Sequence, residues 1–329
     1  MYKLFHRSNG HIARLLGILL LIPWLCQAQT YPTKTIDLIV PFPPGGVADL
    51  IARPIAQKLS QMLGQSVVVE NRGGATGTIG AAIVAHAKPD GYTLLFGTSN
   101  EITMSPSLYK SLPYNPTRDF TPITPVADFP NVLVVGPSLH GVKSLHDLIK
   151  VAHSRAKSLT FASSGIGSTN HLTAVLFKNA AKISILHVPY RGGGPALVGL
   201  MGGQVDALFA TLPSAMALIK SGKIKALAVT GKRRSPVLPN IPTVKESGLP
   251  LTVITWNGML APAGTPAAIV DRLHRALLKI MAEPDIAAKL ASVGAEPITE
   301  TSAAFSNEIR HDFSRWAQVI KTAGISPLD

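Results

Sequence analysis

Residues 36–49, with the sequence IDLIVPFPPGGVAD, decide how this chain folds. The first five residues form a short, mostly apolar run that ends at Pro41, which is typical of a strand buried in a parallel sheet. A loop rich in proline and glycine follows, and apolar residues then recur at helical spacing as far as Gly64, where a helix is expected to stop. The stretch therefore predicts a strand, a tight loop and a helix.

The same alternation of strand and helix continues along most of the chain. Pro54 is expected to bend the first helix or to delay its start, and from Thr265 onward only helices are expected. Repeated strand–helix alternation predicts an α/β fold with a doubly wound sheet, here in two copies. Further strands are expected at residues 67–69, 93–96, 132–135, 159–162, 185–188, 207–210 and 226–229.

The chain is longer than one hydrophobic core usually supports, so two domains are expected. A proline-rich stretch, residues 113–130, leads into a new run of strands, and residues 253–255 lead back to the terminal helices. We therefore expect domain I to comprise residues 29–128 together with 255–329, and domain II to comprise residues 129–254.

The N-terminus has the features of a secretory signal peptide. Three basic residues precede the apolar run 15–25, which is shorter than the roughly 20 residues that span a bilayer. Cleavage after Ala28 is expected, so residues 1–28 form the signal peptide. The alternative is a lipoprotein acylated at Cys26, which the bulky residues before it disfavour. Cys26 is the only cysteine, so the mature chain is expected to have no disulfide.

The net charge of +13 is compatible with nucleic acid, anionic lipid or anionic solutes as partners. The positive charges are scattered, and the densest cluster after the signal peptide, residues 232–234, is expected to be a solvated loop. No nucleic-acid-binding motif accompanies it. No second apolar run reaches membrane-spanning length. We expect no nucleic acid, metal or cofactor.

An enzyme is the less favoured interpretation. Residues 165–170, GIGSTN, are superficially like a dinucleotide-binding loop, but Asn170 replaces the last glycine. No acidic residue lies about 20 positions further on to bind a ribose. The sequence has no G-x-S-x-G, Walker or H-E-x-x-H motif, and no spacing groups Ser, His and Asp as a triad.

Glycine and small hydroxyl residues gather where the predicted strands end and helices begin. Ligands bind at the carboxyl ends of strands in open α/β sheets, and helix N-termini offer free N–H groups that suit an anion. The candidate ligand-binding residues are Phe42, Gly46, Asp49, Thr76, Gly77, Thr98, Asn100, Ser164, Gly167, Ser168, Thr169, His171, Pro189, Tyr190 and Asp206.

Several of these residues also suit a purely structural role. Asp49 is as well placed to cap its helix as to contact a ligand, and Ser164, Ser168 and Thr169 can cap the next helix. His171 lies inside that helix, where a hydrogen-bonded structural histidine is favoured. Arg191 is expected to be an exposed loop residue rather than the partner of a ligand carboxylate.

Six segments resemble, in the same order, those of the Bug family, the substrate-binding receptors of tripartite tricarboxylate transporters. They cover nearly the whole chain after the signal peptide. Pro43 and Pro44 are stiffer than the residues often found there, and Val47 and Ala48 replace polar residues of some members. The six segments are residues 39–49 (IVPFPPGGVAD), 69–77 (VENRGGATG), 88–94 (KPDGYTL), 119–123 (DFTPI), 164–172 (SGIGSTNHL) and 187–192 (HVPYRG).

The resemblance implies a type II periplasmic-binding-protein fold, with the ligand in a cleft between two α/β domains. It implies a periplasmic, monomeric receptor that binds a small carboxylate, either a di- or tricarboxylate, an amino acid or an aromatic acid. Backbone N–H groups, hydroxyls and ordered waters are expected to hold the carboxylate without a dedicated arginine. The implied partners are the membrane permease subunits of the transporter. A sensor subunit that signals to a kinase is the alternative.

Overall fold

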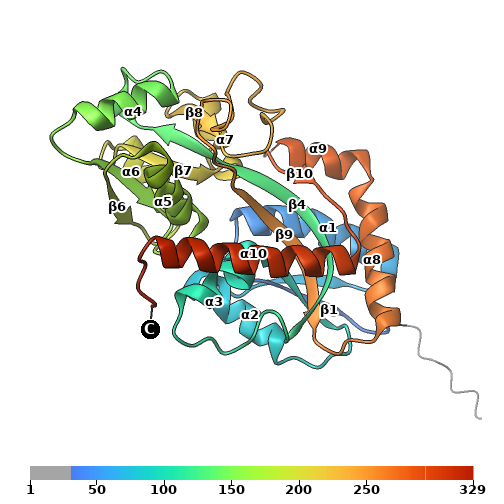
Figure 1. Cartoon of the computed structure of the whole chain (residues 1–329). Coiled ribbons are helices and arrows are strands. Elements are labelled where there is room, and N and C mark those ends of the chain that lie inside the picture. Colours follow the sequence, from blue (N-terminus) through green and yellow to red (C-terminus); the bar gives the residue numbers. More distant parts are fainter. Residues whose placement is uncertain (1–30, 293, 329) are drawn as a thin grey trace, which may run out of the picture.

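The computed structural model describes residues 31–292 and 294–328 (Figure 1). They form a mixed α/β structure in which ten strands make one sheet. The order along the sheet is β2-β1-β3-β9-β4-β7-β5-β6, and β8 and β10 pair with β4. The strands are β1 (Ile36–Val40), β2 (Val67–Asn71), β3 (Thr93–Thr98), β4 (Phe120–Val135), β5 (Leu159–Ser163), β6 (Ile185–Pro189), β7 (Ala207–Thr211), β8 (Lys225–Val229), β9 (Ile254–Pro262) and β10 (Glu296–Pro297).

Helices follow most of the parallel strands, as the sequence predicts. The α-helices are α1 (Val47–Leu63), α2 (Thr78–Ala85), α3 (Ser105–Leu108), α4 (Leu145–Ser154), α5 (Thr169–Ala181), α6 (Gly193–Met201), α7 (Leu212–Lys220), α8 (Ala267–Met281), α9 (Pro284–Ser292) and α10 (Ser302–Thr322). Three further helical turns are η1 (Ala75–Gly77), η2 (Asn100–Met104) and η3 (Pro137–Leu139).

The first half of the sheet contains the parallel strands β1, β2 and β3. Helix α1 buries Ile51, Ile55 and Leu59 against this part of the sheet, because these residues recur at helical spacing on one face. The helix begins at Val47 and continues through Pro54, so the expected delay of its start is not observed.

Strand β4 joins the two halves of the sheet. Residues 120–130 of β4 pair with β9, and residues 131–135 pair with β7 and β8. This long strand crosses the molecule diagonally in Figure 1. The two predicted copies of the doubly wound sheet are therefore parts of one continuous sheet, because a 16-residue strand is long enough to pair with different partners at its two ends. The sequence-predicted domain boundaries, 128/129 and 254/255, lie next to this change of partners.

The largest two core clusters lie on the two halves of the sheet. One packs α1 and α8 against β1 and β3. The other contains Phe161 and Phe209 of β5 and β7, and it also contains Leu108 of α3 and Trp316 of α10. Figure 1 shows α10 running across both halves. Segments that precede residue 129 and follow residue 254 in the sequence therefore contribute to the core of the second half.

The structure corrects the expectation that only helices follow Thr265, and it does not describe the predicted signal peptide. The region after Thr265 is not all helical, because β10 pairs its residues Glu296 and Pro297 with Asp128 and Ala127 of β4. The signal peptide lies outside the described residues. Among the residues that are described, no helix is both long and apolar enough to cross a bilayer.

Candidate ligand-binding site

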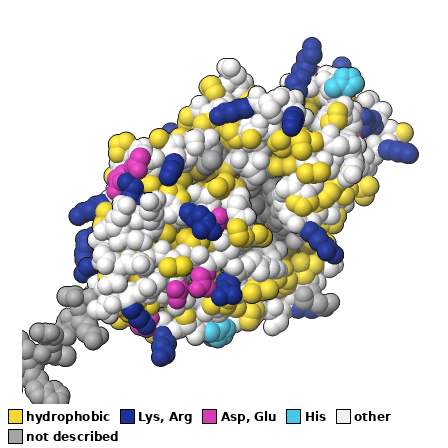
Figure 2. Space-filling view, turned by 180° about the vertical axis from the view of Figure 1, so that it is seen from behind, with side chains coloured by type: hydrophobic (Ala, Val, Ile, Leu, Met, Phe, Trp, Pro, Cys, Tyr) yellow, Lys and Arg dark blue, Asp and Glu magenta, His cyan; other side chains and the backbone are white. Residues whose placement is uncertain are grey.

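The loops after β1, β2 and β3 and those after β5 and β6 lie at the carboxyl ends of parallel strands. They contain most of the candidate residues predicted from the sequence. Figure 2 shows a hollow between the two halves of the molecule. The carboxyl ends of parallel strands are where open α/β sheets bind ligands.

Asp49 organises the loop after β1. Its carboxylate accepts hydrogen bonds from the Gly45 N–H (2.9 Å), from Arg53 Nε (2.9 Å) and from Asn71 Nδ2 (3.0 Å). Burial raises the pKa of Asp49, but the hydrogen bonds from Arg53, Gly45 and Asn71 outweigh it and keep the pKa below its usual range. Asp49 is buried and its oxygens are already occupied, so it shapes the loop in this structure.

The rest of this loop leaves the N-terminus of α1 without a side-chain cap. Gly46 is the N-cap of α1 and has no side chain to cover the first N–H groups of the helix. Phe42 is partly buried against the first core, and its carbonyl accepts a hydrogen bond from Asn71 Nδ2 at 3.0 Å. Asn71 was not predicted as a site residue, although it ends β2 within one of the family-like segments.

The loop after β2 approaches the end of β3 closely. Thr76 and Gly77 both have positive φ values, 56° and 95°. A Cβ atom on Gly77 would lie 2.9 Å from Oε2 of Glu101, so glycine is required both by the backbone conformation and by this contact. Of the predicted residues, Gly77 and Thr98 thus lie against the side chain of Glu101.

Glu101 is fully buried and was not predicted from the sequence. Its Oε1 accepts a hydrogen bond from the Thr98 N–H, and its Oε2 lies 2.6 Å from Thr98 Oγ1. Thr98 Oγ1 also accepts a hydrogen bond from the Asn100 N–H at 3.1 Å. Burial raises the pKa of Glu101 to about 8, although the hydrogen bonds from Thr98 act in the opposite direction.

In the second half, one of the predicted hydroxyl residues, Ser168, caps α5. Ser168 is the N-cap: its Oγ accepts a hydrogen bond from the His171 N–H (3.4 Å) and donates to the Gly165 carbonyl (2.7 Å). Ser164 Oγ donates to Asn170 Oδ1 at 2.5 Å, and Asn170 Nδ2 donates to the Phe209 carbonyl at 2.5 Å. The capping role expected for these hydroxyls is therefore observed for Ser168, whereas the Ser164 hydroxyl bonds to Asn170.

His171 is a structural acceptor in this arrangement. Its Nδ1 accepts a hydrogen bond from the Gly167 N–H at 3.1 Å, and its ring stacks on His187 with 3.8 Å between centroids. Burial, together with the neighbouring His187, lowers the pKa of His171 to about 4. His171 is thus neutral at ordinary pH and holds the loop before α5. His187, in β6, was not predicted from the sequence.

The two halves contact one another through these loops. Asn100 Oδ1 lies 3.4 Å from the backbone N of Thr169 and 3.3 Å from its Oγ1, and both groups donate to it. A Cβ on Gly167 would lie 2.3 Å from Leu108, so α3 packs directly on the loop before α5. Predicted residues from distant parts of the sequence therefore meet at the N-terminus of α5.

Pro189 and Tyr190 end β6. Pro189 is exposed, and the backbone N–H of Tyr190 donates to the Ser163 carbonyl at 3.0 Å. The Tyr190 hydroxyl donates to Gln204 Oε1 at 3.3 Å, so the ring extends along α6 toward its far end. Arg191 is exposed, as predicted from the sequence.

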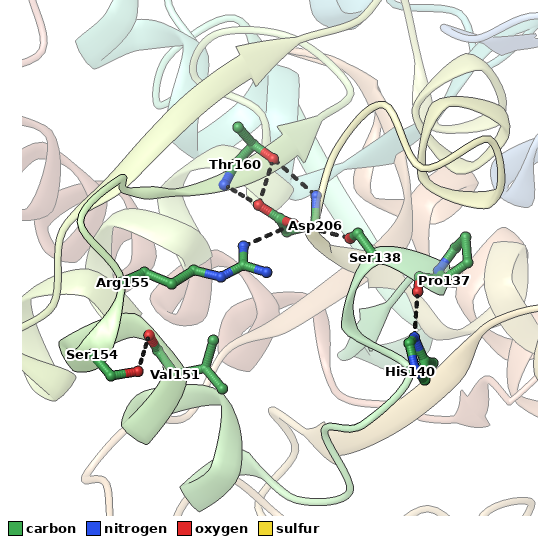
Figure 3. A network of polar contacts seen from close by, with 8 residues as sticks. All are labelled: Pro137, Ser138, His140, Val151, Ser154, Arg155, Thr160 and Asp206. Carbon is green, nitrogen blue, oxygen red and sulfur yellow. Dashed lines mark hydrogen bonds and ion pairs between the residues drawn. The ribbon is translucent and has the colours of Figure 1, made fainter.

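Asp206 is the one predicted residue that lies at the other edge of the sheet. It immediately precedes β7, so it sits at the amino end of the strand (Figure 3). Its carboxylate accepts hydrogen bonds from the Thr160 N–H and Oγ1 and from Ser138 Oγ, each at 2.9 Å, and pairs with Arg155 at 3.3 Å. Asp206 therefore links the start of β7 to β5 through Thr160, and it does not lie with the other candidate ligand-binding residues.

Two surface pockets also lie apart from these loops. One is on the exposed face of α4, and the other is at the amino ends of β1 and β3 beside Lys34 and Asp37. Within the described part of the chain, no group of three His, Cys, Asp or Glu side chains is arranged to hold a metal ion. The neutral donors of the strand-end loops remain the best candidate site.

Comparison with known proteins identifies the family. The model of the tripartite tricarboxylate transporter family receptor matches residues 51–325. Protein BugT of Bordetella pertussis is 38% identical over 300 residues, covering 91% of this chain and 92% of BugT. The structure of R. palustris Rpa4515 with adipate has a TM-score of 0.85 at 39% identity, and periplasmic binding protein BugD has 0.82 at 36%; both matches cover 91% of this chain and 100% of the other.

These similarities confirm the fold and the family predicted from the six segments. The structural relatives are periplasmic solute-binding proteins with two domains, and the family comprises receptors rather than enzymes. The chain belongs to the tripartite tricarboxylate transporter receptor family, the family of the Bug proteins.

Proposed function

We propose that this protein captures a small dicarboxylate between its two halves and delivers it to the permease subunits of a tripartite tricarboxylate transporter. The observation that carries the proposal is the meeting of strand-end loops from both halves, where Asn100 reaches the N-terminus of α5 at Thr169. A helix N-terminus flanked by hydroxyl and amide groups favours an anion. A ligand at this point touches both halves at once.

The ligand carboxylate is held by neutral donors. Arg53 and Arg72, the two arginines closest to the first loops in sequence, already pair with Asp49 and Glu70. Charge-assisted hydrogen bonds from backbone N–H and hydroxyl groups are strong enough to replace an ion pair. The adipate of Rpa4515, a relative 39% identical to this chain, makes a linear dicarboxylate the first ligand to test.

The domain assignment follows from the same arrangement. Residues 29–128 with 255–329 form domain I, and residues 129–254 form domain II. The change of strand partners between residues 130 and 131 of β4 supports these boundaries. The receptor is a monomer and has no catalytic activity. Its signal peptide, residues 1–28, directs it to the periplasm.

Native mass spectrometry of the freshly purified protein tests the proposal, because such a cleft retains a tightly bound ligand. We expect one small carboxylic acid per chain. Calorimetry with adipate and malate then shows whether the longer or the shorter dicarboxylate binds with the higher affinity. Asn100→Ala should weaken binding, whereas Ser138→Ala, at the opposite edge of the sheet, should not. A protein that retains no carboxylic acid and binds no di- or tricarboxylate would contradict the proposal.

A further inference from the structure

Glu101 is a buried acid without a cation. Both of its oxygens hydrogen bond to Thr98, the last residue of β3. None of the described Lys, Arg or His side chains forms an ion pair with it. The Tyr114 hydroxyl donates a hydrogen bond to the backbone carbonyl of Glu101 at 2.7 Å. Burial raises the pKa of Tyr114 far enough to keep it neutral.

Among the described residues, glycine and apolar side chains of the neighbouring elements pack around Glu101. The loop after β2 presents Gly77, and β3 presents Gly97, both within 3.5 Å when a Cβ is placed on them. Helix α10 contributes Phe305 and Ile309, which share an apolar cluster with Ile102 next to Glu101. An ionised carboxylate in these surroundings accepts hydrogen bonds from the Thr98 hydroxyl, the Thr98 N–H and its own backbone N–H, but the described residues supply no counter-charge, which is costly.

The hydroxyl of Thr98 can form three hydrogen bonds, one through its hydrogen and two through its lone pairs, and the structure shows partners for two of them. One points to Glu101 Oε2 at 2.6 Å, and the second receives the Asn100 N–H at 3.1 Å. When Glu101 is ionised, the hydroxyl must donate to Oε2, and its third direction is a lone pair. When Glu101 is protonated, it donates to Oγ1 instead, and the third direction carries the hydroxyl hydrogen.

We propose that Glu101 is a positioning residue, whose proton turns the Thr98 hydroxyl into a hydrogen-bond donor for the ligand carboxylate. The inference rests on the proposed function, because it assumes that a carboxylate binds at the carboxyl end of β3. The protonated form offers the anion a donor, and the ionised form offers it a lone pair and a nearby negative charge. Ligand binding is therefore linked to one proton on Glu101.

The pH dependence of adipate binding tests this linkage. Above the pKa of Glu101, about 8, the dissociation constant of the wild type should rise about tenfold per pH unit, with uptake of one proton per adipate. Adipate carries both charges throughout this range, so its own titration does not contribute. Calorimetry in buffers of different ionisation enthalpy measures the proton uptake directly.

Glu101→Gln is the informative variant, because its amide N–H donates to Thr98 Oγ1 at every pH while its carbonyl accepts the Thr98 N–H. It should bind adipate without pH dependence, and Thr98→Val should bind weakly with no proton uptake. Thr103→Val is the matched control: it removes a buried hydroxyl of the same helical turn, bonded to the Ser99 carbonyl at 2.7 Å, and should keep the wild-type pH profile. A pH-independent wild type, or a Glu101→Gln variant with the wild-type profile, would overturn the inference.

A failure of the proposed function is separable from a failure of this inference. If adipate does not bind at any pH, infrared difference spectra of wild type and Glu101→Gln without ligand decide the matter. A protonated carboxyl band near pH 7 that disappears above about pH 8 supports the role of Glu101. Absence of that band near pH 7 means that Glu101 is ionised, and the inference is then wrong.

Discussion

Two buried carboxyl groups in the first half of the molecule have opposite surroundings. Asp49 pairs with Arg53 at 2.8 Å and accepts two further hydrogen bonds from Gly45 and Asn71, which keeps its pKa low. Glu101 accepts hydrogen bonds from Thr98 and from its own backbone N–H, it pairs with none of the described cationic side chains, and burial raises its pKa to about 8.

The difference shows that burial alone does not decide the charge of an acid beside an anion site. Asp49 stays ionised because a cation and an N–H group compensate it, and its role is to hold the first loop. Glu101 is uncompensated, so it keeps its proton and adds no negative charge where a carboxylate has to bind. A receptor for anions can therefore contain both groups next to its ligand loops.

The largest expected effect on ligand affinity comes from adding a side chain at Gly46, in the loop that Asp49 stabilises. Gly46 has φ −74° and ψ 168°, which valine tolerates, and its Cβ would lie 3.2 Å from the Pro43 carbonyl. Gly46→Val should keep the fold but cover the N-terminus of α1, with a loss of ligand affinity of more than about 100-fold, or roughly 3 kcal/mol. Calorimetry measures it. Gly141→Val, where no atom lies within 4 Å of the new Cβ, is the control and should bind normally.

The same chemical change at the two acids should have opposite effects on stability. Asp49→Asn leaves Arg53 and the Gly45 N–H without their charged acceptor, and should lower the free energy of unfolding by roughly 2 kcal/mol. Glu101→Gln should raise it by roughly 2 kcal/mol near pH 7, because glutamine needs no proton to be buried. Urea unfolding near pH 7 tests both. Equal destabilisation by the two variants would contradict the contrast.

The pH dependence of stability should also separate the two acids. The contribution of Glu101 is fully present below its unfolded pKa of 4.5 and is lost as the pH rises toward 8, because the folded state binds the proton more tightly. The contribution of Asp49 is present above 3.8 and is lost as the pH falls, because its folded pKa is lowered. Unfolding curves of wild type and both variants from about pH 3 to pH 8 measure these opposite trends.

The smallest expected effect on ligand affinity is that of replacing Arg191, which is exposed and takes no part in the hydrogen bonds described for Asp49 and Glu101. Arg191→Ala should cost less than about 1 kcal/mol of ligand affinity, since an exposed charge contributes little. Calorimetry at low and at physiological salt gives this number. A large loss for Arg191→Ala would mean that an ion pair, and not the neutral donors, leads binding.

The regular pattern of the sequence predicted most of the fold. Short apolar runs and helical spacing gave the alternation of strands and helices, and glycine-rich segments gave the loops at the strand ends. The continuous sheet was not predicted, because periodicity does not show which strands pair. For the same reason, the packing of Leu108 and Trp316 in the second core was not foreseen.

The site was predicted less completely than the fold. Sequence position identified Asn100 and Thr169, which meet across the two halves. It placed Asp206 in the site, although a residue that precedes a strand lies at the amino edge of the sheet. Glu101 was missed because a single acidic residue gives no pattern, and its burial depends on contacts with Gly77 and Thr98 that only the tertiary structure creates.

A ligand that contacts both halves should close the molecule around itself. Small-angle scattering tests it most directly, with the ligand found by native mass spectrometry first removed and then restored. Because such a ligand stabilises only the arrangement in which both sets of contacts exist, we expect the radius of gyration to fall on restoration. Saturation of the site verified by calorimetry, with a radius of gyration that does not change, would contradict the account.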